Sequence, residues 1–300
     1  MVKLELEADV DMLLGLADYF IGRGEMAQAG AALTAALQVA EEARKGPILS
    51  RLGFTRQPPA AARALLDVQK AIEAISPTGA FVTDGLAVWF KTLPFLDDVR
   101  FMALAEQHQH LLPIPNWQWN LATVLWAVEQ ASGIAGDLVE LGVFRGHTTL
   151  FVADYVDFAA WPKRWLLYDT FDGVPDDQLN PGWAEVNRKQ YKGQFSFEEV
   201  RDRFARFPNI EVVQGRAPQV FDQVCPEAIS FLHMDLNSAI AEIQSLEVLF
   251  DRISPGGVVV FDDYCWGSAR AQHEAEKRWF AERGLSVLPL ATGQGLFVKR

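Results

Sequence analysis

The segment from Gly136 to Leu150, GDLVELGVFRGHTTL, constrains the fold of this chain more than any other stretch. Its first half is apolar and predicts a short buried strand over 137–143, and its second half predicts a helix that begins near Gly146 or His147. Gly142 lacks the Cβ that would obstruct a ligand at the turn, and Gly146 lets the helix start close to the strand. Main-chain N–H groups at the helix start can face a polar ligand. The segment therefore predicts a strand–turn–helix unit with a ligand site at its turn.

Glu140 is the unusual residue of the predicted strand, because a carboxylate at the end of an apolar strand is costly unless a partner neutralises it. A ligand that carries an ammonium group would supply that partner. The ordinary structural alternative is an arginine elsewhere in the chain, and the strand alone does not choose between the two.

The spacing of the glycines separates two classes of cofactor. A dinucleotide turn has the pattern G-x-G-x-x-G, whose second glycine lets the pyrophosphate approach the main chain. Here Phe144 stands at that position, so a pyrophosphate has poor access. The pattern acid-x-Gly-x-x-x-Gly is similar to that of methyltransferases that use S-adenosylmethionine. This resemblance places Glu140, Gly142, Phe144 and Gly146 at the cofactor.

From residue 137 onward, apolar runs alternate with helical patterns, which is typical of a parallel sheet with helices on both faces. Strands are predicted over 137–143, 164–169, 209–214, 228–235 and 257–262, and helices over 147–157, 198–207, 239–253 and 268–284. Segments 285–289 and 294–299 predict a closing, hairpin-like pair with an antiparallel last strand. The segment 171–196 is too long for a plain connection and is predicted to be a lid or substrate loop.

Two predicted strand ends carry further candidates for the cofactor site. Asp169 ends the second strand, where a carboxylate can accept both hydroxyls of a ribose, and a structural role as a turn cap is the alternative. Gln214 and Gly215 end the third strand, where an adenine edge would lie in this architecture. Because adenine is commonly bound through main-chain groups, the side-chain pattern adds little evidence for that role.

Three carboxylates follow the fourth and fifth predicted strands: Asp235 in HMDLN, and Asp262 with Asp263 in FDDY. Neighbouring parallel strands would bring these acids to the rim where such sheets bind ligands. Acids that converge need protons or a cation, and all-oxygen ligands favour Mg²⁺ or another hard divalent cation. Helix capping by Asp262 or Asp263, with Asp235 solvated, is the alternative.

The N-terminal part of the chain has helical patterns. Residues 12–44 predict two antiparallel helices around a turn at Gly22–Gly24, similar to a single tetratricopeptide unit. One such unit cannot bury its own faces, so the hairpin is expected to pack on the rest of the chain or on another subunit of a homo-oligomer. A linker over 53–59 and helices over 60–75, 85–91, 97–109 and 117–131 are predicted to follow. The predicted domains are a helical hairpin (1–50), a helical region (51–131) and an S-adenosylmethionine-binding domain (132–300).

The charge of the chain excludes some partners. With 27 basic and 39 acidic residues the net charge is −12, and no basic cluster offers the positive face that nucleic acid binding needs. The first residues, MVKLELEADVD, lack the features of a secretion signal, and no apolar run approaches the ~18 residues that span a membrane. A cytoplasmic protein that acts on a small molecule is expected. Cys225 and Cys265 are too far apart in sequence to predict a disulfide framework or a thiolate metal site.

Five segments together resemble the macrocin O-methyltransferase family, which methylates sugar hydroxyls: GDLVELGVFRG, LLYDTFDGVP, HMDLNS, SPGGVVVFDDYCW and LPLATGQGLFVK. The resemblance runs from about residue 117 to the C-terminus. It implies a class I methyltransferase fold, an α/β Rossmann-like and mostly parallel sheet with an antiparallel last strand, and S-adenosylmethionine as cofactor. It also implies that Asp235, Asp262 and Asp263 bind Mg²⁺. Family members often carry an acid or a tyrosine just after the first of these aspartates, and one such acid acts as the base, whereas this chain has Asn237 and Ser238 there.

An amide cannot take a proton, so two histidines remain as candidates for the general base. His233 lies on the same face of its strand as Asp235 but one repeat deeper, where a core histidine is the alternative. His273 lies on the helix after the acidic pair, where a surface residue is the alternative.

The leading hypothesis is transfer of a methyl group to a hydroxyl of a sugar or glycosylated small molecule, with a metal that orients the acceptor and lowers its pKa. A non-catalytic cofactor-binding or scaffold protein is a competing hypothesis, because a clear base after Asp235 is missing. A nicotinamide-dependent oxidoreductase is another, and Phe144 in the glycine turn argues against it.

Overall fold

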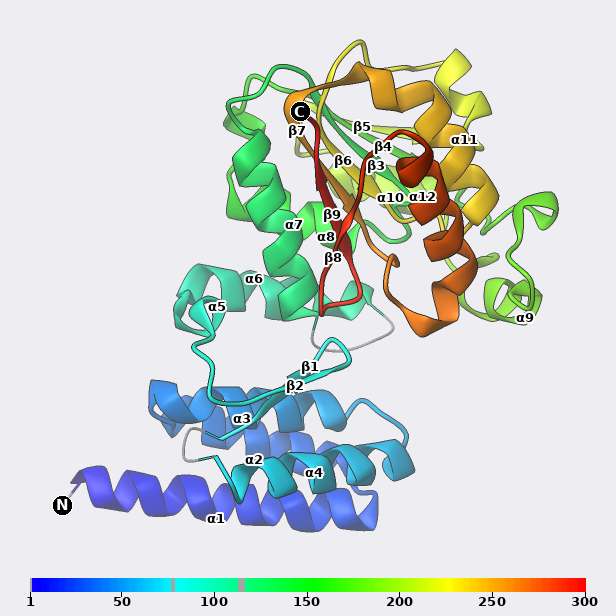
Figure 1. Ribbon diagram of the computed structural model, residues 1–300. Coiled ribbons are helices and arrows are strands. Elements are labelled where there is room, and N and C mark those ends of the chain that lie inside the picture. The colour runs from blue at the N-terminus through cyan, green and yellow to red at the C-terminus, as the bar shows by residue number, and fades with distance from the viewer. Residues whose placement is uncertain (1, 77–78, 113–116) are drawn as a thin grey trace. The chain divides into compact units, whose positions relative to one another are not determined.

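The computed structural model describes residues 2–76, 79–112 and 117–300, and the chain forms two compact units, Met1–Trp119 and Asn120–Arg300 (Figure 1). The boundary falls inside helix α7 (Gln118–Ala131), whereas the sequence analysis placed it between residues 131 and 132. Most of α7 belongs with the second unit, where its Asn120 side chain donates a hydrogen bond to Asp262. The division of the preceding residues into 1–50 and 51–131 stays a prediction.

Four helices build most of the first unit: α1 (Val2–Arg23), α2 (Met26–Val39), α3 (Glu42–Phe54) and α4 (Pro59–Glu73). Apolar side chains of α1, α2 and α3 share one core, so the N-terminal hairpin packs on the rest of its own chain. Arg51 of α3 is buried and pairs with Asp18 of α1 at 3.1 Å and with Glu73 of α4 at 2.9 Å. A buried guanidinium needs such partners, and these two tie three helices together. The predicted homo-oligomer stays a prediction.

The first unit departs from the sequence analysis at two places. Helix α3 was not predicted as a separate element, because Gly46 and Pro47 interrupt its helical pattern. The helix predicted over 85–91 is wrong: the chain forms a hairpin of β1 (Phe81–Thr83) and β2 (Leu86–Val88) there. Asp84 and Gly85 have φ of 50° and 68°, and two consecutive positive φ values make the tight turn that joins short strands. Helices α5 (Pro94–Asp97) and α6 (Val99–His108) follow.

The second unit is built on a seven-stranded sheet in the order β5-β4-β3-β6-β7-β9-β8 (Figure 1). The strands are β3 (Asp137–Leu141), β4 (Trp165–Asp169), β5 (Ile210–Gln214), β6 (Ile229–Met234), β7 (Ile253–Phe261), β8 (Leu288–Pro289) and β9 (Gly295–Val298). Strands β3 to β7 are parallel, and β9 pairs antiparallel with β7. The predicted mostly parallel sheet with an antiparallel last strand is therefore confirmed.

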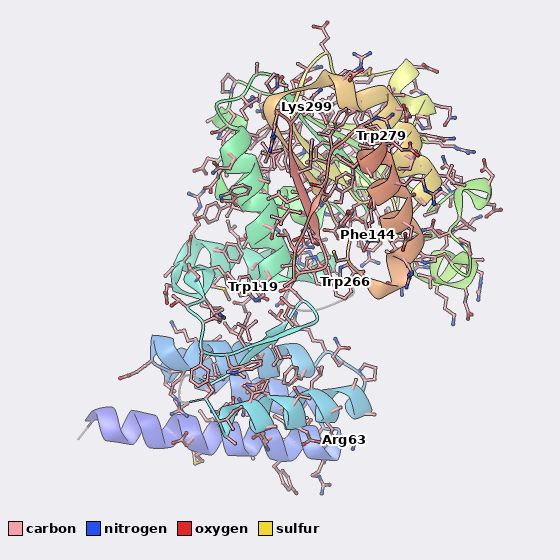
Figure 2. The ribbon with its side chains drawn as sticks, in the orientation of Figure 1. Arg63, Trp119, Phe144, Trp266, Trp279 and Lys299 are labelled. Carbon is pink, nitrogen blue, oxygen red and sulfur yellow. The ribbon has the colours of Figure 1, made fainter. Side chains whose placement is uncertain are left out.

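Helices cover both faces of this sheet: α7, α8 (His147–Tyr155), α10 (Phe197–Phe204), α11 (Ala239–Leu249) and α12 (Arg270–Glu282). Helices α11 and α12 pack against each other and share a core with alternate residues of the strands, such as Val139 and Leu141. Trp279 of α12, labelled in Figure 2, packs on Phe250 with a ring separation of 4.9 Å. The intervening strand residues face the opposite way, and Glu140 is one of them.

None of the helices in the described ranges combines the length and apolar character that crossing a membrane would require. Cys225 and Cys265 are free thiols.

Candidate active site

The glycine turn after β3 is closed by Asp169, the last residue of β4. Oδ2 of Asp169 accepts the N–H groups of Val143 and Phe144, both at 2.8 Å, and Oδ1 accepts the N–H of Phe171 at 2.7 Å. Three main-chain donors thus already occupy the carboxylate. The capping role that was the alternative to ribose binding is present, and it fixes the conformation of the turn.

Asp169 nevertheless retains some capacity to accept hydrogen bonds. Each carboxylate oxygen accepts about two, and Oδ2 already has two. The Thr170 hydroxyl lies 3.4 Å from Oδ1, but its single proton has the much shorter contact of 2.6 Å with the carbonyl of Gly173. Oδ1 therefore has room for one ligand hydroxyl, and the prediction that Asp169 accepts both ribose hydroxyls has to be reduced to one.

Gly142 is required by the protein itself. Its φ is 87°, and a Cβ built on it would lie 1.9 Å from the main-chain oxygen of Asp235. The expectation that the missing Cβ makes room for a ligand is wrong, because the end of β6 fills that space. Gly146 has φ of 76° and precedes α8, as predicted, and a Cβ there would lie 2.6 Å from the ring of Phe204 in α10. Close packing therefore explains both glycines.

Glu140 is buried and is neutralised from within the protein. Strand pairing places Glu140 of β3 directly beside His233 of β6, and Glu140 Oε1 lies 2.9 Å from His233 Nδ1. Its Oε2 accepts the hydroxyl of Thr149 in α8. The partner that the sequence analysis sought in a ligand ammonium group or an arginine is a histidine, which an apolar strand pattern does not reveal.

His233 bridges two carboxylates. Its Nε2 lies 3.4 Å from Asp262 Oδ1, and the residue is 1% exposed. Burial alone would lower the pKa of His233, but the hydrogen bonds and charges of Asp262 and Glu140 outweigh it and raise the pKa to about 9. Both nitrogens therefore hold protons at neutral pH. Both ring nitrogens face carboxylates, which fits the alternative of a satisfied core histidine, and the role of His233 as a general base stays a prediction.

Of the three aspartates at the rim, Asp262 has the most hydrogen-bond donors among the side chains described here. Its Oδ1 also accepts the side-chain amides of Asn120 in α7, at 2.8 Å, and of Gln294 before β9, at 3.3 Å. Although burial opposes ionisation, these donors and His233 lower the pKa of Asp262. Asp262 is thus a carboxylate, and the partners described here bind only one of its oxygens.

Asp235 and Asp263 have the opposite character. Strands β6 and β7 are neighbours, as the sequence analysis required, so Asp235 follows β6 close to the end of β7. Burial and then repulsion by Asp262 raise the pKa of Asp263 to about 8, and the same two causes raise that of Asp235. Within the described ranges, no three His, Cys, Asp or Glu side chains are grouped closely enough to hold a metal ion. Burial and mutual repulsion favour the protonated forms of Asp235 and Asp263.

A second acidic group lies beside Asp263, and the sequence analysis missed it. Glu242 of α11 and Glu276 of α12 are each 1% exposed and lie against each other, and Gln272 Nε2 donates to Glu242 Oε1 at 3.1 Å. Their Oε2 atoms receive no hydrogen bond from the donors of the described residues, so a proton has to be shared between them. Burial raises the pKa of Glu242 to about 7 and raises that of Glu276 well above its ordinary value.

This shared proton predicts how stability depends on pH. The pair keeps its proton to about pH 7 in the folded protein, whereas a glutamate of the unfolded chain loses it near 4.5. The folded state therefore binds more protons between these values, and the free energy of unfolding falls as pH rises, by up to ~1.4 kcal/mol per pH unit for one proton. In Glu276→Gln the amide donates to Glu242 without titrating, so the dependence should flatten. Urea unfolding of both proteins from about pH 5 to 8, in chelator, measures this, and parallel curves would contradict the shared proton.

The other predicted site residues lie at different places. His273 Nδ1 lies 2.8 Å from the carbonyl of Tyr264 and so donates to it, and the contacts described for His273 do not include the three aspartates. Gln214 is exposed, and its amide donates to Thr170 O at 3.3 Å. The N–H of Gly215 donates to the carbonyl of Asp169 at 2.9 Å. Their roles at adenine, and that of His273 as a base, stay predictions.

The segment 171–196 contributes an aromatic side chain that the sequence analysis missed. Tyr191 packs edge-to-face on Phe144 of the glycine turn, with ring centroids 5.6 Å apart. Burial and then the charges of Asp235 and Asp263 raise the pKa of the Tyr191 phenol, so its ring and hydroxyl lie near both the turn and the rim. Only the unusual length of the segment signals this in the sequence, since nothing local shows where its side chains reach.

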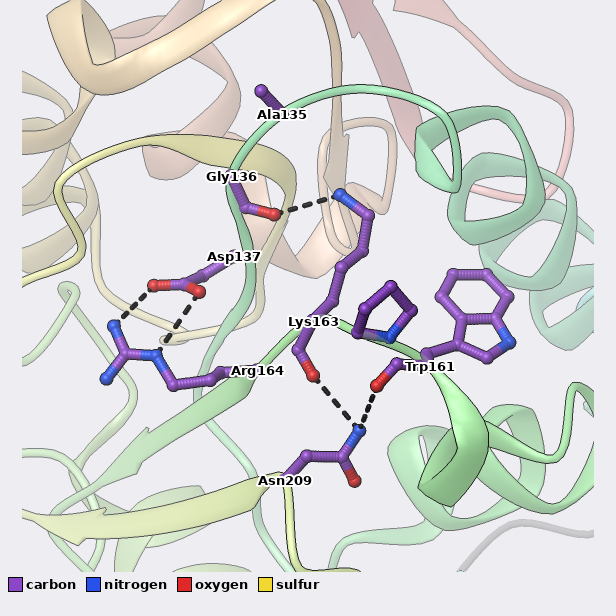
Figure 3. Close-up of a pocket in the computed structure, with 8 residues that line it drawn as sticks. Ala135, Gly136, Asp137, Trp161, Lys163, Arg164 and Asn209 are labelled. Carbon is purple, nitrogen blue, oxygen red and sulfur yellow. Dashed lines mark hydrogen bonds and ion pairs between the residues drawn. The ribbon is translucent and has the colours of Figure 1, made fainter.

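One hollow of the second unit lies away from these residues (Figure 3). It measures about 550 Å³ and is lined near the amino ends of β3, β4 and β5 by Asp137, Lys163, Arg164 and Asn209, among others. Its charged groups are engaged: Arg164 pairs with Asp137 at 2.6 Å, and Lys163 donates to the carbonyl of Gly136 at 2.9 Å. Sheets of this kind bind ligands at the carboxyl ends of their strands, so the rim is the better candidate.

Comparison with known proteins identifies the family of the chain. The model of the macrocin O-methyltransferase family matches residues 119–287, more than half of the chain. The 8-demethyl-8-(2,3-dimethoxy-alpha-L-rhamnosyl)-tetracenomycin-C 4'-O-methyltransferase of Streptomyces olivaceus is 28% identical over 194 residues, which cover 61% of this chain and 71% of the relative. The mycinamicin III 3''-O-methyltransferase of Micromonospora griseorubida is 31% identical over 163 residues, which cover 49% and 62%.

A solved structure supports the fold. The structure of the O-methyltransferase NovP superimposes with a TM-score of 0.55 and 19% identity, covering 67% of this chain and 97% of NovP. The glycine turn, the seven-stranded sheet and the family match thus agree, and they exclude the oxidoreductase and non-catalytic hypotheses. The chain belongs to the macrocin O-methyltransferase family and is an O-methyltransferase, for which the family supports S-adenosylmethionine as the methyl donor.

Proposed function

We propose that this enzyme methylates a hydroxyl of a sugar or of a glycosylated small molecule, with assistance from a divalent cation. The observation that carries the proposal is the position of the acid rim, Asp235, Asp262 and Asp263, at the ends of β6 and β7, since β6 lies beside the strand that carries the glycine turn. The names of both relatives support the acceptor class: one acts on a rhamnosyl compound and the other on mycinamicin III.

The cofactor would bind along the turn from Gly142 to Gly146. Oδ1 of Asp169 would accept one ribose hydroxyl, and the side chain of Phe144 would pack beside the sulfonium end. Glu140 would support the cofactor site indirectly, through the strand that leads into the turn, because His233 and Thr149 already bind its two oxygens. Gln214 and Gly215 would lie near the adenine.

Asp235, Asp262 and Asp263 would hold the cation, Mg²⁺ by preference for oxygen ligands. Their chemistry fits: Asp262 is ionised and uses Oδ1 for its protein partners, and the raised pKa values of Asp235 and Asp263 reflect repulsion that a cation would relieve. A bound cation would help to bind the acceptor through its hydroxyls and would lower the pKa of the hydroxyl that reacts.

The protein's own groups would orient the acceptor and receive its proton. Holding an acceptor hydroxyl in line with the methyl group supplies much of the rate of such a transfer. His273 remains the candidate base, because the donation from Nδ1 to the Tyr264 carbonyl leaves Nε2 with a free lone pair. His233 would instead keep Asp262 ionised and in place.

The test supplies the full-length protein with S-adenosylmethionine, Mg²⁺ and p-nitrophenyl α-L-rhamnoside, with catechol as a non-sugar acceptor. We expect mass spectrometry to find one added methyl group on the rhamnoside and calorimetry to find binding of S-adenosylhomocysteine but not of NAD. Excess EDTA should suppress the product. Methylation of catechol alone would overturn the sugar assignment, and full turnover in EDTA would overturn the metal assignment.

A further inference from the structure

Tyr191 has a position that the proposed chemistry has not yet used. It ends a short π-helical turn, Asn187–Tyr191 (η4), and its ring meets Phe144 at 5.6 Å with an interplanar angle of 78°. Phe144 also contacts Phe195 of the same segment at 4.8 Å. The charges that act on the Tyr191 phenol belong to Asp235, Asp263, Asp262 and Asp169. Tyr191 thus lies between the cofactor turn and the acid rim, where the methyl group and its acceptor have to meet.

Asn187 holds Tyr191 in this position. Its Nδ2 donates to the carbonyl of Val174 at 2.8 Å, and its Oδ1 accepts the N–H of Val174 at 2.9 Å. Its own carbonyl accepts the N–H of Lys192 at 2.9 Å, the five-residue bond that makes the turn π-helical. Such turns are frequent at functional sites, because the wider ring redirects the side chains that follow. These hydrogen bonds join Val174, near the start of the segment, to Asn187, the first residue of the turn that Tyr191 ends.

Asn180 fastens the same segment to the rim. It is 5% exposed, its Nδ2 donates to the carbonyl of Asn237 at 3.1 Å, and its Oδ1 accepts the N–H of Ala239 at 3.0 Å. Asn237 lies in the connection from β6 to α11, two residues after Asp235, and Ala239 is the first residue of α11. The segment that carries Tyr191 is therefore bound to the chain beside the acids.

We propose that Tyr191 binds the methyl acceptor, with its ring against the C–H face of a sugar and its hydroxyl on a sugar oxygen. The inference rests on the proposed function and names the residue that would set acceptor geometry. A tyrosine has an apolar body and a polar tip, and a pyranose offers an apolar face edged by hydroxyls, so the two surfaces are complementary. An acceptor held there would have Phe144 and the cofactor turn on one side and the aspartates on the other.

Two substitutions separate the ring from the hydroxyl. Tyr191→Phe should raise the KM for p-nitrophenyl α-L-rhamnoside about 5-fold through loss of one hydrogen bond. Tyr191→Leu should raise it further, on the order of 10- to 100-fold, through loss of the aromatic face. Titration of the rhamnoside into the complex with S-adenosylhomocysteine should show matching losses of affinity. Affinity for S-adenosylhomocysteine should stay at the wild-type value in both variants. The thermal midpoint should stay at the wild-type value in Tyr191→Phe, which keeps the ring contact with Phe144, and this separates acceptor binding from a structural effect.

Tyr155→Phe and Tyr155→Leu are the matched controls. Tyr155 is the last residue of α8, so it lies a full helix away from the glycine turn, and its ring stacks on Phe151. Both control proteins should keep the wild-type KM. Wild-type KM and rhamnoside affinity in both Tyr191 variants would overturn the inference, and so would a parallel loss of S-adenosylhomocysteine affinity. A wild type that neither binds nor methylates the rhamnoside, although it binds S-adenosylhomocysteine, would overturn the proposed function and this inference with it.

Discussion

Asp235→Asn and Asp263→Asn are expected to leave the enzyme at least as stable as the wild type at neutral pH while lowering methyl transfer about 100-fold or more. Burial and repulsion by the neighbouring acids raise the pKa values of Asp235 and Asp263, and a neutral asparagine avoids both costs. The pKa of Asp263 is raised to about 8, so the wild type should lose stability as pH rises from 3.8, the ordinary pKa of an aspartate, to about 8, and Asp263→Asn should not. Thermal melts and rhamnoside turnover with Mg²⁺ measure the two effects.

The other aspartates supply the contrasts. Asp262→Asn should lower stability by roughly 3–5 kcal/mol, because it leaves the buried His233 with one carboxylate partner instead of two. Asp251→Asn, at an exposed acid beyond α11, should match the wild type in both measurements. Normal turnover in Asp235→Asn and Asp263→Asn, together with full activity in EDTA, would mean that the rim is structural and holds no metal.

Gly142→Val is expected to prevent stable folding, whatever its effect on the cofactor. A Cβ would lie 1.9 Å from the Asp235 carbonyl oxygen, and φ of 87° disfavours any side chain, so even Gly142→Ala should cost on the order of 3–5 kcal/mol. Chemical denaturation followed by circular dichroism gives the loss directly.

Gly133→Ala is the matched control for that experiment. Nothing lies within 4 Å of the Cβ position of Gly133, and its backbone is outside the positive-φ region. Its stability should differ little from that of the wild type. A Gly142→Ala protein as stable as Gly133→Ala would show that the end of β6 can move away from the turn.

The sequence was sufficient to predict most strands of the sheet and the residues at which those strands end. The apolar runs predict β3, β4, β5 and β6 to within about two residues. In a doubly wound sheet, the ends of the strands carry the ligand-binding residues. That rule predicts Asp169, Asp235 and Asp262 at one rim. Family resemblance then supplied the chemistry that spacing alone left open.

The partners of these residues could not be predicted from the sequence, because each partner comes from a distant element. Glu140 is paired with His233 from 93 positions away, and Asp262 with Asn120 from 142 positions away. A pattern within one strand shows that a charge is buried but not what neutralises it. The same reason hid the role of Gly142, whose neighbour is the end of another strand.

The chain of Glu140, His233 and Asp262 crosses three adjacent strands, β3, β6 and β7. Each member neutralises the next, so none can be exchanged for the residue of a relative on its own without stranding a charge in the interior. Chimeras of this enzyme with other methyltransferases should therefore work only when all three strands come from one parent, even if the crossover points lie in exposed loops. In this protein, Glu140, His233 and Asp262 should therefore be kept together when segments are exchanged. Crossover points for exchanging acceptor-binding segments are best placed where they leave β3, β6 and β7 in one parent.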